Sequence, residues 1–348
     1  MRYLVTGHTG FKGAWLAQML AADGHEVSGL SLDPAADSLF ARARVGELLA
    51  HDLRADIRDA AATAAAMREA SPEVVIHLAA QSLVRESYRD PRTTWETNVN
   101  GTYNVLDAVA GTPGVRAVLV ITTDKVYRNT NRVTGYREDE PLGGLDPYSA
   151  SKAAADLLTQ SWIASSGCSV PTAIARAGNV VGGGDVCAER LMVDLIAAFS
   201  AGHDVVLRSP HAVRPWQHVL DCLDGYLTLT EALLAGTASG EAFNFGPDSR
   251  ELVPVLTVAE AVARLWGTGC GVVVDSAPAP AEAQRLSLDV SKARNRLGWR
   301  GRLDFTQTLQ WTIDWAKADA AGTDPRQVCS DQLRAFARMG AANWGPES

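Results

Sequence analysis

The sequence predicts an α/β fold: a doubly wound parallel sheet with a smaller, interleaved C-terminal substrate lobe. Apolar, strand-like runs alternate with helix-like runs from residue 1 to about residue 180. A glycine-rich turn joins the first strand to the first helix. The 348-residue length exceeds the usual size of one domain. We therefore expect a Rossmann-like nucleotide-binding domain over residues 1–180, returning at about 218–247, and a substrate lobe over residues 181–217 and 248–348.

The elements of the first half follow from apolar runs that end at glycine, proline or polar residues. Short runs rich in Val, Ile and Leu predict strands over residues 1–6, 26–32, 74–78, 116–122 and 173–176. Helical periodicity predicts helices over residues 11–20, 92–110 and 147–165, and the last of these begins at an Asp-Pro pair, which favours a helix start. The glycines of residues 178–185 are expected to break regular structure.

The second half is expected to contain shorter elements. The pattern predicts helices over residues 190–200, 218–234, 258–265, 291–297 and 305–317. It predicts strands over residues 205–208 and 241–245. No internal repeat or low-complexity linker separates these elements, so we expect the second lobe to be interleaved with the sheet.

The glycine-rich turn predicts a site for a dinucleotide. Its spacing, Gly-x-x-Gly-x-x-Gly, is typical of short-chain dehydrogenases. At such a turn the helix N-terminus presents free N–H groups and a positive dipole end to a pyrophosphate. The alternative is an ordinary tight turn. The candidate cofactor contacts in this turn are Gly7, Thr9, Gly10, Phe11, Lys12 and Gly13.

The remaining cofactor contacts are expected where later strands end, because ligands bind at the carboxyl ends of parallel strands. Asp33 follows the second strand, and an acid there accepts ribose hydroxyls and repels a 2′-phosphate, which favours NAD over NADP. Asp33 could instead only begin the loop through Pro34. Further candidates are Asp56 and Ile57 beside the adenine, and the small-residue stretch Leu78, Ala79 and Ala80.

Two clusters of polar residues predict acid–base chemistry. Tyr148 and Lys152 are four residues apart on one helix face, the arrangement with which short-chain dehydrogenases make a base at neutral pH. Thr123, Asp124 and Lys125 end a strand and supply a further acid and base. Tyr148, Asp124 and Lys125 together supply three groups that can transfer protons, and three such groups beside one nicotinamide predict a dehydration. In the alternative interpretations Lys125 forms an ion pair, Asp124 caps a loop and Thr123 is a structural hydroxyl.

Composition excludes several classes of function. The formal net charge is −8 and the isoelectric point is about 5.4, which argues against a nucleic-acid binder. No apolar run approaches the roughly 20 residues of a membrane span, so no membrane partner is expected. The histidines lack metal-ligand spacing, and no metal is expected. Five scattered cysteines predict reduced thiols and a cytoplasmic location.

The chain resembles the sugar-nucleotide 4,6-dehydratases of the extended short-chain dehydrogenase family, and among them the CDP-glucose 4,6-dehydratases. The similarity runs from Met1 to about Trp315. Related dTDP-glucose dehydratases usually carry Thr-Asp-Glu where this chain has Thr-Asp-Lys, and the epimerases lack the acid and base pair. The similar motifs are residues 7–13 (GHTGFKG), 77–81 (HLAAQ), 123–125 (TDK), 135–144 (GYREDEPLGG), 176–185 (RAGNVVGGGD) and 214–219 (RPWQHV).

This resemblance implies a reaction on a nucleotide-diphosphate hexose with NAD as cofactor. Tyr148 would take the proton of the 4-hydroxyl as hydride leaves carbon 4, with Lys152 favouring the phenolate. Lys125 would then remove the proton of carbon 5, and Asp124 would protonate the departing 6-hydroxyl. The hydride would return to carbon 6, so the cofactor would stay bound through turnover.

Other residues are candidates for binding. Arginine forks match phosphate oxygens, and we expect Asn179, Arg190 and Arg214 to bind the diphosphate, although Arg190 could also be a solvated helix residue. Asn98 is a candidate cofactor contact, but it could instead anchor a water or kink its helix. The candidate substrate contacts are Gln81, Asn179, Arg190, Arg208 and Arg214.

Two other functions fit the same scaffold. A sugar-nucleotide epimerase or reductase would need Tyr148 and Lys152 only. A non-enzymatic dinucleotide sensor typically loses the tyrosine, which this chain retains. A homodimer or homotetramer is expected, with the helices around Asn98 and Tyr148 at the dimer face.

Overall fold

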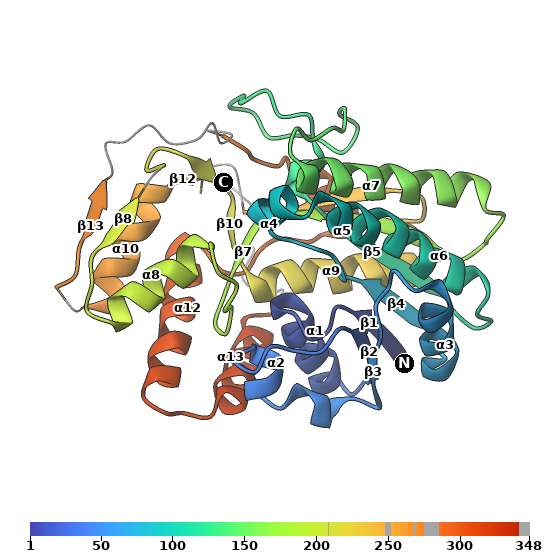
Figure 1. The fold of residues 1–348 in the computed structure, drawn as a ribbon, viewed down its shortest axis with the longest axis horizontal. Coiled ribbons are helices and arrows are strands. Elements are labelled where there is room, and N and C mark those ends of the chain that lie inside the picture. The colour runs from blue at the N-terminus through green and yellow to red at the C-terminus, as the bar shows by residue number, and fades with distance from the viewer. Residues whose placement is uncertain (208, 248–251, 268, 275–284, 341–348) are drawn as a thin grey trace.

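The computed structural model describes residues 1–207, 209–247, 252–267, 269–274 and 285–340. Its centre is a seven-stranded parallel sheet in the order β11-β6-β5-β4-β1-β2-β3 (Figure 1). The predicted doubly wound α/β fold is therefore confirmed. The strands of this sheet are β1 (Arg2–Thr6), β2 (Glu26–Ser31), β3 (His51–Arg54), β4 (Val74–His77), β5 (Ala117–Thr123), β6 (Thr172–Ala177) and β11 (Ala242–Phe245).

The strand order reverses between β1 and β4, and in such sheets ligands bind in the crevice outside the carboxyl ends at that point. Helices cover both faces of the sheet (Figure 1). One face carries α3 (Ala60–Ala70), α6 (Thr102–Ala110) and α7 (Pro147–Ser165). The other carries α1 (Phe11–Ala22), α9 (Val219–Leu234) and α11 (Ser291–Leu297). The catalytic candidates therefore lie on strands and helices that surround the crevice.

Two apolar cores hold the sheet, one on each face. In β1, Tyr3 and Val5 pack toward α1 and α9, whereas Leu4 packs toward α3 and α6. In β5, Leu119 belongs to the first core and Val120 to the second. Because successive side chains of a strand point to opposite faces, a strand buried on both faces reads as a continuous apolar run.

A smaller lobe stands beside the sheet and has its own apolar core (Figure 1). Its helices are α8 (Leu191–Ser200), α10 (Val255–Trp266) and α12 (Phe305–Ala320). Its strands form three pairs: β7 (Asn179–Val181) with β10 (Trp216–His218), β9 (Val213–Arg214) with β12 (Val253–Pro254), and β8 (Val205–Leu207) with β13 (Val272–Val274). The remaining short elements are α2 (Leu39–Arg42), η1 (Val45–Leu48), α4 (Val84–Arg89), α5 (Pro91–Trp95) and η3 (Asp124–Val126).

The structure differs from the predicted elements in several places. It contains β3, α3, α4 and the pair β9 and β12, for which no element was predicted. The helix predicted over residues 92–110 is divided into α5, a π-helical segment η2 (Glu96–Gly101) and α6. The stretch 178–185 contains the short strand β7, which pairs with β10. The helix α13 (Pro325–Met339) was not predicted. It lies in the part of the chain expected to form the substrate lobe, yet it packs against α1 and α2, and its Phe336 is buried in the core beneath the sheet.

No helix within the described ranges is both long and apolar enough to cross a bilayer.

Candidate active site

The turn between β1 and α1 requires glycine at two positions. Gly7 has φ 75°, and a Cβ atom on it would lie 2.8 Å from the amide nitrogen of Ala79. A Cβ atom on Gly13 would lie 2.2 Å from the carbonyl oxygen of Gly7. Helix α1 begins at Phe11, and its N-cap residue, Gly10, has no side chain to cap the free N–H groups. These N–H groups and the positive end of the helix dipole suit a pyrophosphate.

Two other residues of this turn make contacts within the protein. Thr9 Oγ1 donates to the carbonyl oxygen of Leu32 at 3.2 Å and lies 2.7 Å from Ser31 Oγ, which ties the turn to the end of β2. Lys12 Nζ donates to the hydroxyl of Tyr226 on α9, 3.2 Å away. Burial lowers the pKa of Lys12. The Lys12 side chain is therefore directed between α1 and α9.

The acid at the end of β2 is accessible. The Asp33 side chain is 91% exposed, and its Oδ1 lies 4.0 Å from Arg54 Nε. Asp56 is engaged by Arg58 at 2.6 Å, and this hydrogen bond lowers the pKa of the Asp56 carboxyl. Ile57 is buried beneath that loop. Asp33 is therefore the carboxylate of this edge that is most open to a ribose.

The loop after β4 is held by β1. The amide of Leu78 donates to the carbonyl oxygen of Thr6 at 3.2 Å, and the amide of Ala79 donates to Thr6 Oγ1 at 3.1 Å. Ala79 and Ala80 have no side-chain atom beyond Cβ, so a flat ligand can approach the backbone here.

Asn98 and Gln81 are joined to each other. Asn98 lies fully buried in the π-helical segment η2; its Oδ1 accepts from the amide of Gln81 at 2.8 Å, and its Nδ2 donates to Ser151 Oγ of α7 at 2.9 Å. Gln81 Nε2 donates to Thr94 Oγ1 at 2.8 Å. Both side chains therefore fasten the β4 loop to α5 and α7. Their predicted cofactor and substrate contacts stay predictions.

The Thr-Asp-Lys motif turns sharply out of β5. The chain passes from Thr123 into η3, and the Thr123 side chain caps that turn by accepting from the amide of Lys125. Asp124 is fully buried, and its Oδ1 accepts from Thr123 Oγ1 at 2.9 Å. Its Oδ2 has no hydrogen-bond partner among the described residues. Lys125 Nζ lies 3.9 Å from Asp124 Oδ1.

Tyr148 and Lys152 lie in the first two turns of α7, whose N-cap is Asp146. Burial raises the pKa of Tyr148 to about 12, while a hydrogen bond with the Thr123 side chain lowers this pKa and the charge of Asp124 raises it. Lys152 is buried, and burial together with the charge of Lys12 lowers its pKa to about 8. The five predicted catalytic residues thus lie together at the carboxyl end of β5.

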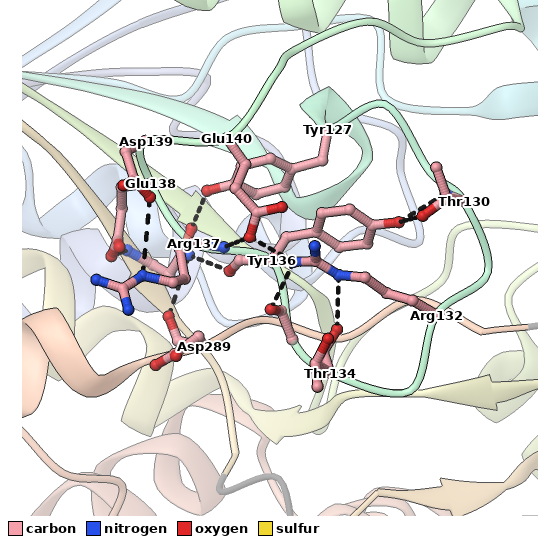
Figure 2. Close-up of polar contacts among 12 residues, drawn as sticks. Tyr127, Thr130, Arg132, Thr134, Tyr136, Arg137, Glu138, Asp139, Glu140 and Asp289 are labelled. Atoms are coloured by element: carbon pink, nitrogen blue, oxygen red, sulfur yellow. Dashed lines mark hydrogen bonds and ion pairs between the residues drawn. The ribbon is translucent and has the colours of Figure 1, made fainter.

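The loop from η3 to α7 carries predicted catalytic residues at both of its ends. Figure 2 shows that the loop is held by its own polar contacts. The Tyr127 and Tyr136 rings stack with centroids 5.3 Å apart, and Arg132 forms an ion pair with Glu140. Tyr127 also donates from its hydroxyl to Asn244 Oδ1 of β11 at 2.7 Å. These contacts hold residues 127–140 of the loop together and join them to β11.

The predicted substrate contacts lie on different elements of the structure. Arg190 precedes α8, donates to Asp185 Oδ2 at 2.6 Å, and lowers the pKa of Tyr148 by its charge, so it lies near Tyr148. Asn179 is the first residue of β7, directly after the carboxyl end of β6. Arg214 ends β9. The predicted contact Arg208 lies outside the described residues.

The buried histidines serve the framework. His77 lies between Thr6 Oγ1 at 2.7 Å and Thr102 Oγ1 at 2.9 Å, and burial lowers its pKa to about 3. His218 accepts from the amide of Leu220 and so caps α9. The part of the chain that the structure describes contains no group of three or more His, Cys, Asp or Glu side chains able to hold a metal.

Sequence reasoning missed one buried polar residue near this centre. Gln217 of β10 is 4% exposed, and neither Nε2 nor Oε1 has a hydrogen-bond partner among the residues that the structure describes. A signal was present, because Gln217 belongs to the motif of residues 214–219.

Comparisons with known proteins give the family. Residues 4–312 match the family model described as GDP-mannose 4,6 dehydratase. The chain belongs to the GDP-mannose 4,6 dehydratase family. It is 41% identical over 338 residues to a CDP-glucose 4,6-dehydratase of Salmonella typhimurium, covering 94% of each chain. It is 32% identical over 336 residues to a dTDP-glucose 4,6-dehydratase of Streptomyces antibioticus, covering 93% of this chain and 95% of the relative.

Solved structures agree with this family. The dTDP-glucose 4,6-dehydratase DesIV of Streptomyces venezuelae, determined with NAD bound, superposes with a TM-score of 0.79 at 27% identity, covering 94% of this chain and all of that one. A UDP-glucose 4-epimerase of Thermotoga maritima has a TM-score of 0.81 at 22% identity, which shows the shared fold alone. The predicted resemblance to sugar-nucleotide 4,6-dehydratases, which are lyases, is confirmed.

Proposed function

We propose that the protein converts CDP-glucose to CDP-4-keto-6-deoxyglucose by intramolecular dehydration, with NAD as its resident cofactor. The observation that supports this best is the buried Asp124 carboxylate, whose Oδ2 has no partner among the described residues, beside Lys125 and Tyr148. Oxidation alone requires only Tyr148 and Lys152. A second acid and base at the same strand end serve an elimination.

The residues present suit NAD. The uncapped start of α1 matches the pyrophosphate, and the exposed carboxylate of Asp33 matches the ribose hydroxyls. Arg54, at the same edge, already donates to Asp52 and to the carbonyl oxygen of Leu32. When bound, NAD would accept hydride from carbon 4 of the sugar and return it to carbon 6.

Tyr148 would remove the proton of the 4-hydroxyl. Its phenol hydrogen-bonds Thr123, which favours the phenolate that burial disfavours. The Lys152 ammonium is fixed close by, and its positive charge would stabilise the phenolate. Thr123 would also bind the 4-hydroxyl, because its side chain lies between Tyr148 and Asp124.

Lys125 and Asp124 would carry out the elimination. A ketone at carbon 4 acidifies the proton of carbon 5, and the Lys125 amine would remove it. The Lys125 ammonium would return a proton to carbon 5 as hydride reaches carbon 6. Asp124 would hold a proton on its free Oδ2 and donate it to the 6-hydroxyl, which then leaves as water.

We further propose that the smaller lobe binds the nucleotide diphosphate. Arg190 and Arg214 would face its phosphate oxygens, with Asn179 at the junction of the lobe and the sheet. Arg190 is held by Asp185, so it would exchange this carboxylate for a phosphate on substrate binding. The cytidine base is proposed from the Salmonella typhimurium relative, named as a CDP-glucose 4,6-dehydratase.

We also propose a cytoplasmic homodimer. All five cysteines are free thiols, as expected in a reducing compartment. Four large apolar side chains are between 41% and 65% exposed on α4, α5, α6 and α7, namely Tyr88, Trp95, Tyr103 and Leu157. Helices α5, α6 and α7 pack together, and a second copy could cover this apolar face. Sedimentation of the wild type beside Tyr103→Glu and Leu157→Glu variants tests this contact.

The proposed reaction is tested with purified protein, NAD and CDP-glucose. The expected product has lost one water and carries a 4-keto-6-deoxy sugar, detected by mass spectrometry and by NMR. Parallel assays with dTDP-, UDP- and GDP-glucose measure kcat/KM for each base, and CDP-glucose is expected to give the highest value. An epimerised product that retains its 6-hydroxyl would overturn the proposal in favour of the epimerase.

A further inference from the structure

The buried side chain of Gln217 lacks hydrogen-bond partners among the described residues. A primary amide offers two donors and two acceptor sites, and buried amides are normally paired. Gln217 is 4% exposed, and both its polar atoms lack a partner among the residues that the structure describes. A buried amide without hydrogen-bond partners destabilises the folded protein, so a ligand group is expected to pair with it.

The neighbours of Gln217 show which way its side chain points. Trp216 and His218, on either side of it, face the core of the smaller lobe and the ring of Trp311. Because side chains alternate along a strand, Gln217 faces the opposite side. Its partner in the register of β7 is Val180, which packs against the core beneath α1 and α9.

Contacts on both sides of Gln217 place it between two parts of the site. Pro215, two residues before it, lies 2.4 Å from where a Cβ atom on Gly178 would be, and that position is 3.2 Å from Asp124 Oδ2. Val219 is two residues after Gln217. A Cβ atom on Gly182 would lie 2.6 Å from Val219 and 3.3 Å from the Phe11 ring. Gln217 therefore lies between the acid of the catalytic centre and the first residue of α1.

We propose that Gln217 hydrogen-bonds the carboxamide of the nicotinamide ring. This inference rests on the proposed NAD cofactor, whose pyrophosphate would lie at the start of α1 and whose reactive ring would lie beside Tyr148 and Asp124. The nicotinamide half must then pass between Phe11 and Asp124, where Gln217 lies. One carboxamide would meet both free atoms of Gln217, since it accepts from Nε2 and donates to Oε1.

The pairing would fix the rotation of the nicotinamide ring, and with it the face presented to the sugar. Two hydrogen bonds of ordinary strength would contribute about 10- to 100-fold to the affinity for NAD. Gln217 is thus assigned as a residue that binds and orients the cofactor, with no part in proton transfer.

The experiment measures the dissociation constants of NAD and of 3-acetylpyridine adenine dinucleotide, in which a methyl group replaces the carboxamide NH2. Calorimetry compares wild type with Gln217→Met, which keeps the side-chain length, and with Gln217→Leu. Wild type is expected to prefer NAD, and both variants are expected to bind NAD about 10- to 100-fold more weakly and to lose this preference. Gln332→Leu is the control, because Gln332 Oε1 also lacks a partner among the described residues but lies on α13.

Thermal melts without cofactor separate this effect from misfolding. An apolar replacement of an unpaired buried amide should leave the melting temperature unchanged or raise it, while the shift induced by NAD should shrink. If the variants retain the wild-type preference for NAD over the analogue, the inference is overturned and the proposed function stands. If wild type itself binds no NAD, the proposed cofactor is wrong, and this inference with it.

Discussion

Lys152 Nζ donates to the backbone carbonyl oxygen of Ile121 at 2.8 Å, so α7 is joined to β5 two residues before the Thr-Asp-Lys motif begins. The Lys152 ammonium is thereby fixed against β5, on the helix that also carries Tyr148. It is also buried with Lys12 nearby, and these two causes lower the pKa of Lys152 to about 8. The positive charge that would favour the proposed Tyr148 phenolate is therefore lost as pH rises through about 8.

The first prediction concerns pH. The protonated fraction of Lys152 falls as pH rises through about 8, so kcat/KM should decline by about tenfold per pH unit above this value. Lys152→Arg keeps its charge at these pH values, and its lower activity should show no such decline. Lys292→Arg is the matched control. Lys292 Nζ also donates to a backbone carbonyl oxygen, that of Ala242 at 2.8 Å, but it lies away from the site. A decline that survives in Lys152→Arg would show that another group titrates.

A second prediction separates chemistry from cofactor binding. Tyr148→Phe removes the phenolic proton acceptor, so kcat should fall by about 10²-fold or more, and the dissociation constant of NAD should stay within about twofold. Steady-state kinetics and calorimetry measure the two quantities. Tyr103→Phe, at an exposed position on α6, should change neither. Turnover at the wild-type rate in Tyr148→Phe would contradict the proposed mechanism.

Lys125→Met tests the elimination. Oxidation at carbon 4 depends on Tyr148 and Lys152, so this variant should still form enzyme-bound NADH from substrate, while water loss should slow by about 10²- to 10⁴-fold. A single-turnover experiment follows NADH absorbance together with the entry of solvent deuterium at carbon 5. Lys317→Met, on α12, is the control. Undiminished deuterium entry in Lys125→Met would assign the base to a different residue.

Gly178 holds space beside the proposed acid. A Cβ atom there would lie 2.4 Å from the Pro215 ring and 3.2 Å from Asp124 Oδ2, so Gly178→Ala must displace one of them. We expect kcat to fall about tenfold or more while far-UV circular dichroism is unchanged. In Gly111→Ala the new atom would come no closer than 3.8 Å to its nearest neighbours, and activity should be kept. If Gly178→Ala were as active as wild type, the position of Asp124 would not be critical.

The last prediction concerns stability in acid. Burial lowers the pKa of His218 from 6.5 to about 3, so the unfolded chain binds a proton below pH 6.5 that the folded chain does not. Stability should therefore fall by about 1.4 kcal/mol per pH unit from this residue as pH drops below 6.5. His218→Asn can still cap α9, and it should flatten that loss in urea unfolding at about pH 7 and about pH 5. An equal change of the free energy of unfolding with pH in wild type and His218→Asn would refute this. His203→Asn, at an exposed position, is the control.

Local chemistry explains why several predictions from the sequence succeeded. Gly7 and Gly13 could be recognised because a tight strand-to-helix turn leaves no room for a Cβ atom, a requirement that depends only on residues close in the chain. Helix α7 occupies the predicted residues 147–165, since an Asp-Pro pair marks its start. The division of the helix around Asn98 escaped prediction, because the π-helical segment is stabilised by distant partners, Gln81 and Ser151.

By itself, the sequence determined most strands and helices of the first half and the glycine turn, and it predicted the acid–base residues, because these depend on local pattern and on side-chain chemistry. Only the tertiary structure decided which of those groups are desolvated and what they face. The low pKa of Lys152 arises from burial by segments far apart in the chain, as does the lack of a partner, among the described residues, for Asp124 Oδ2 and for the Gln217 amide. Dielectric environment and hydrogen-bond satisfaction depend on three-dimensional neighbours, which no local pattern specifies.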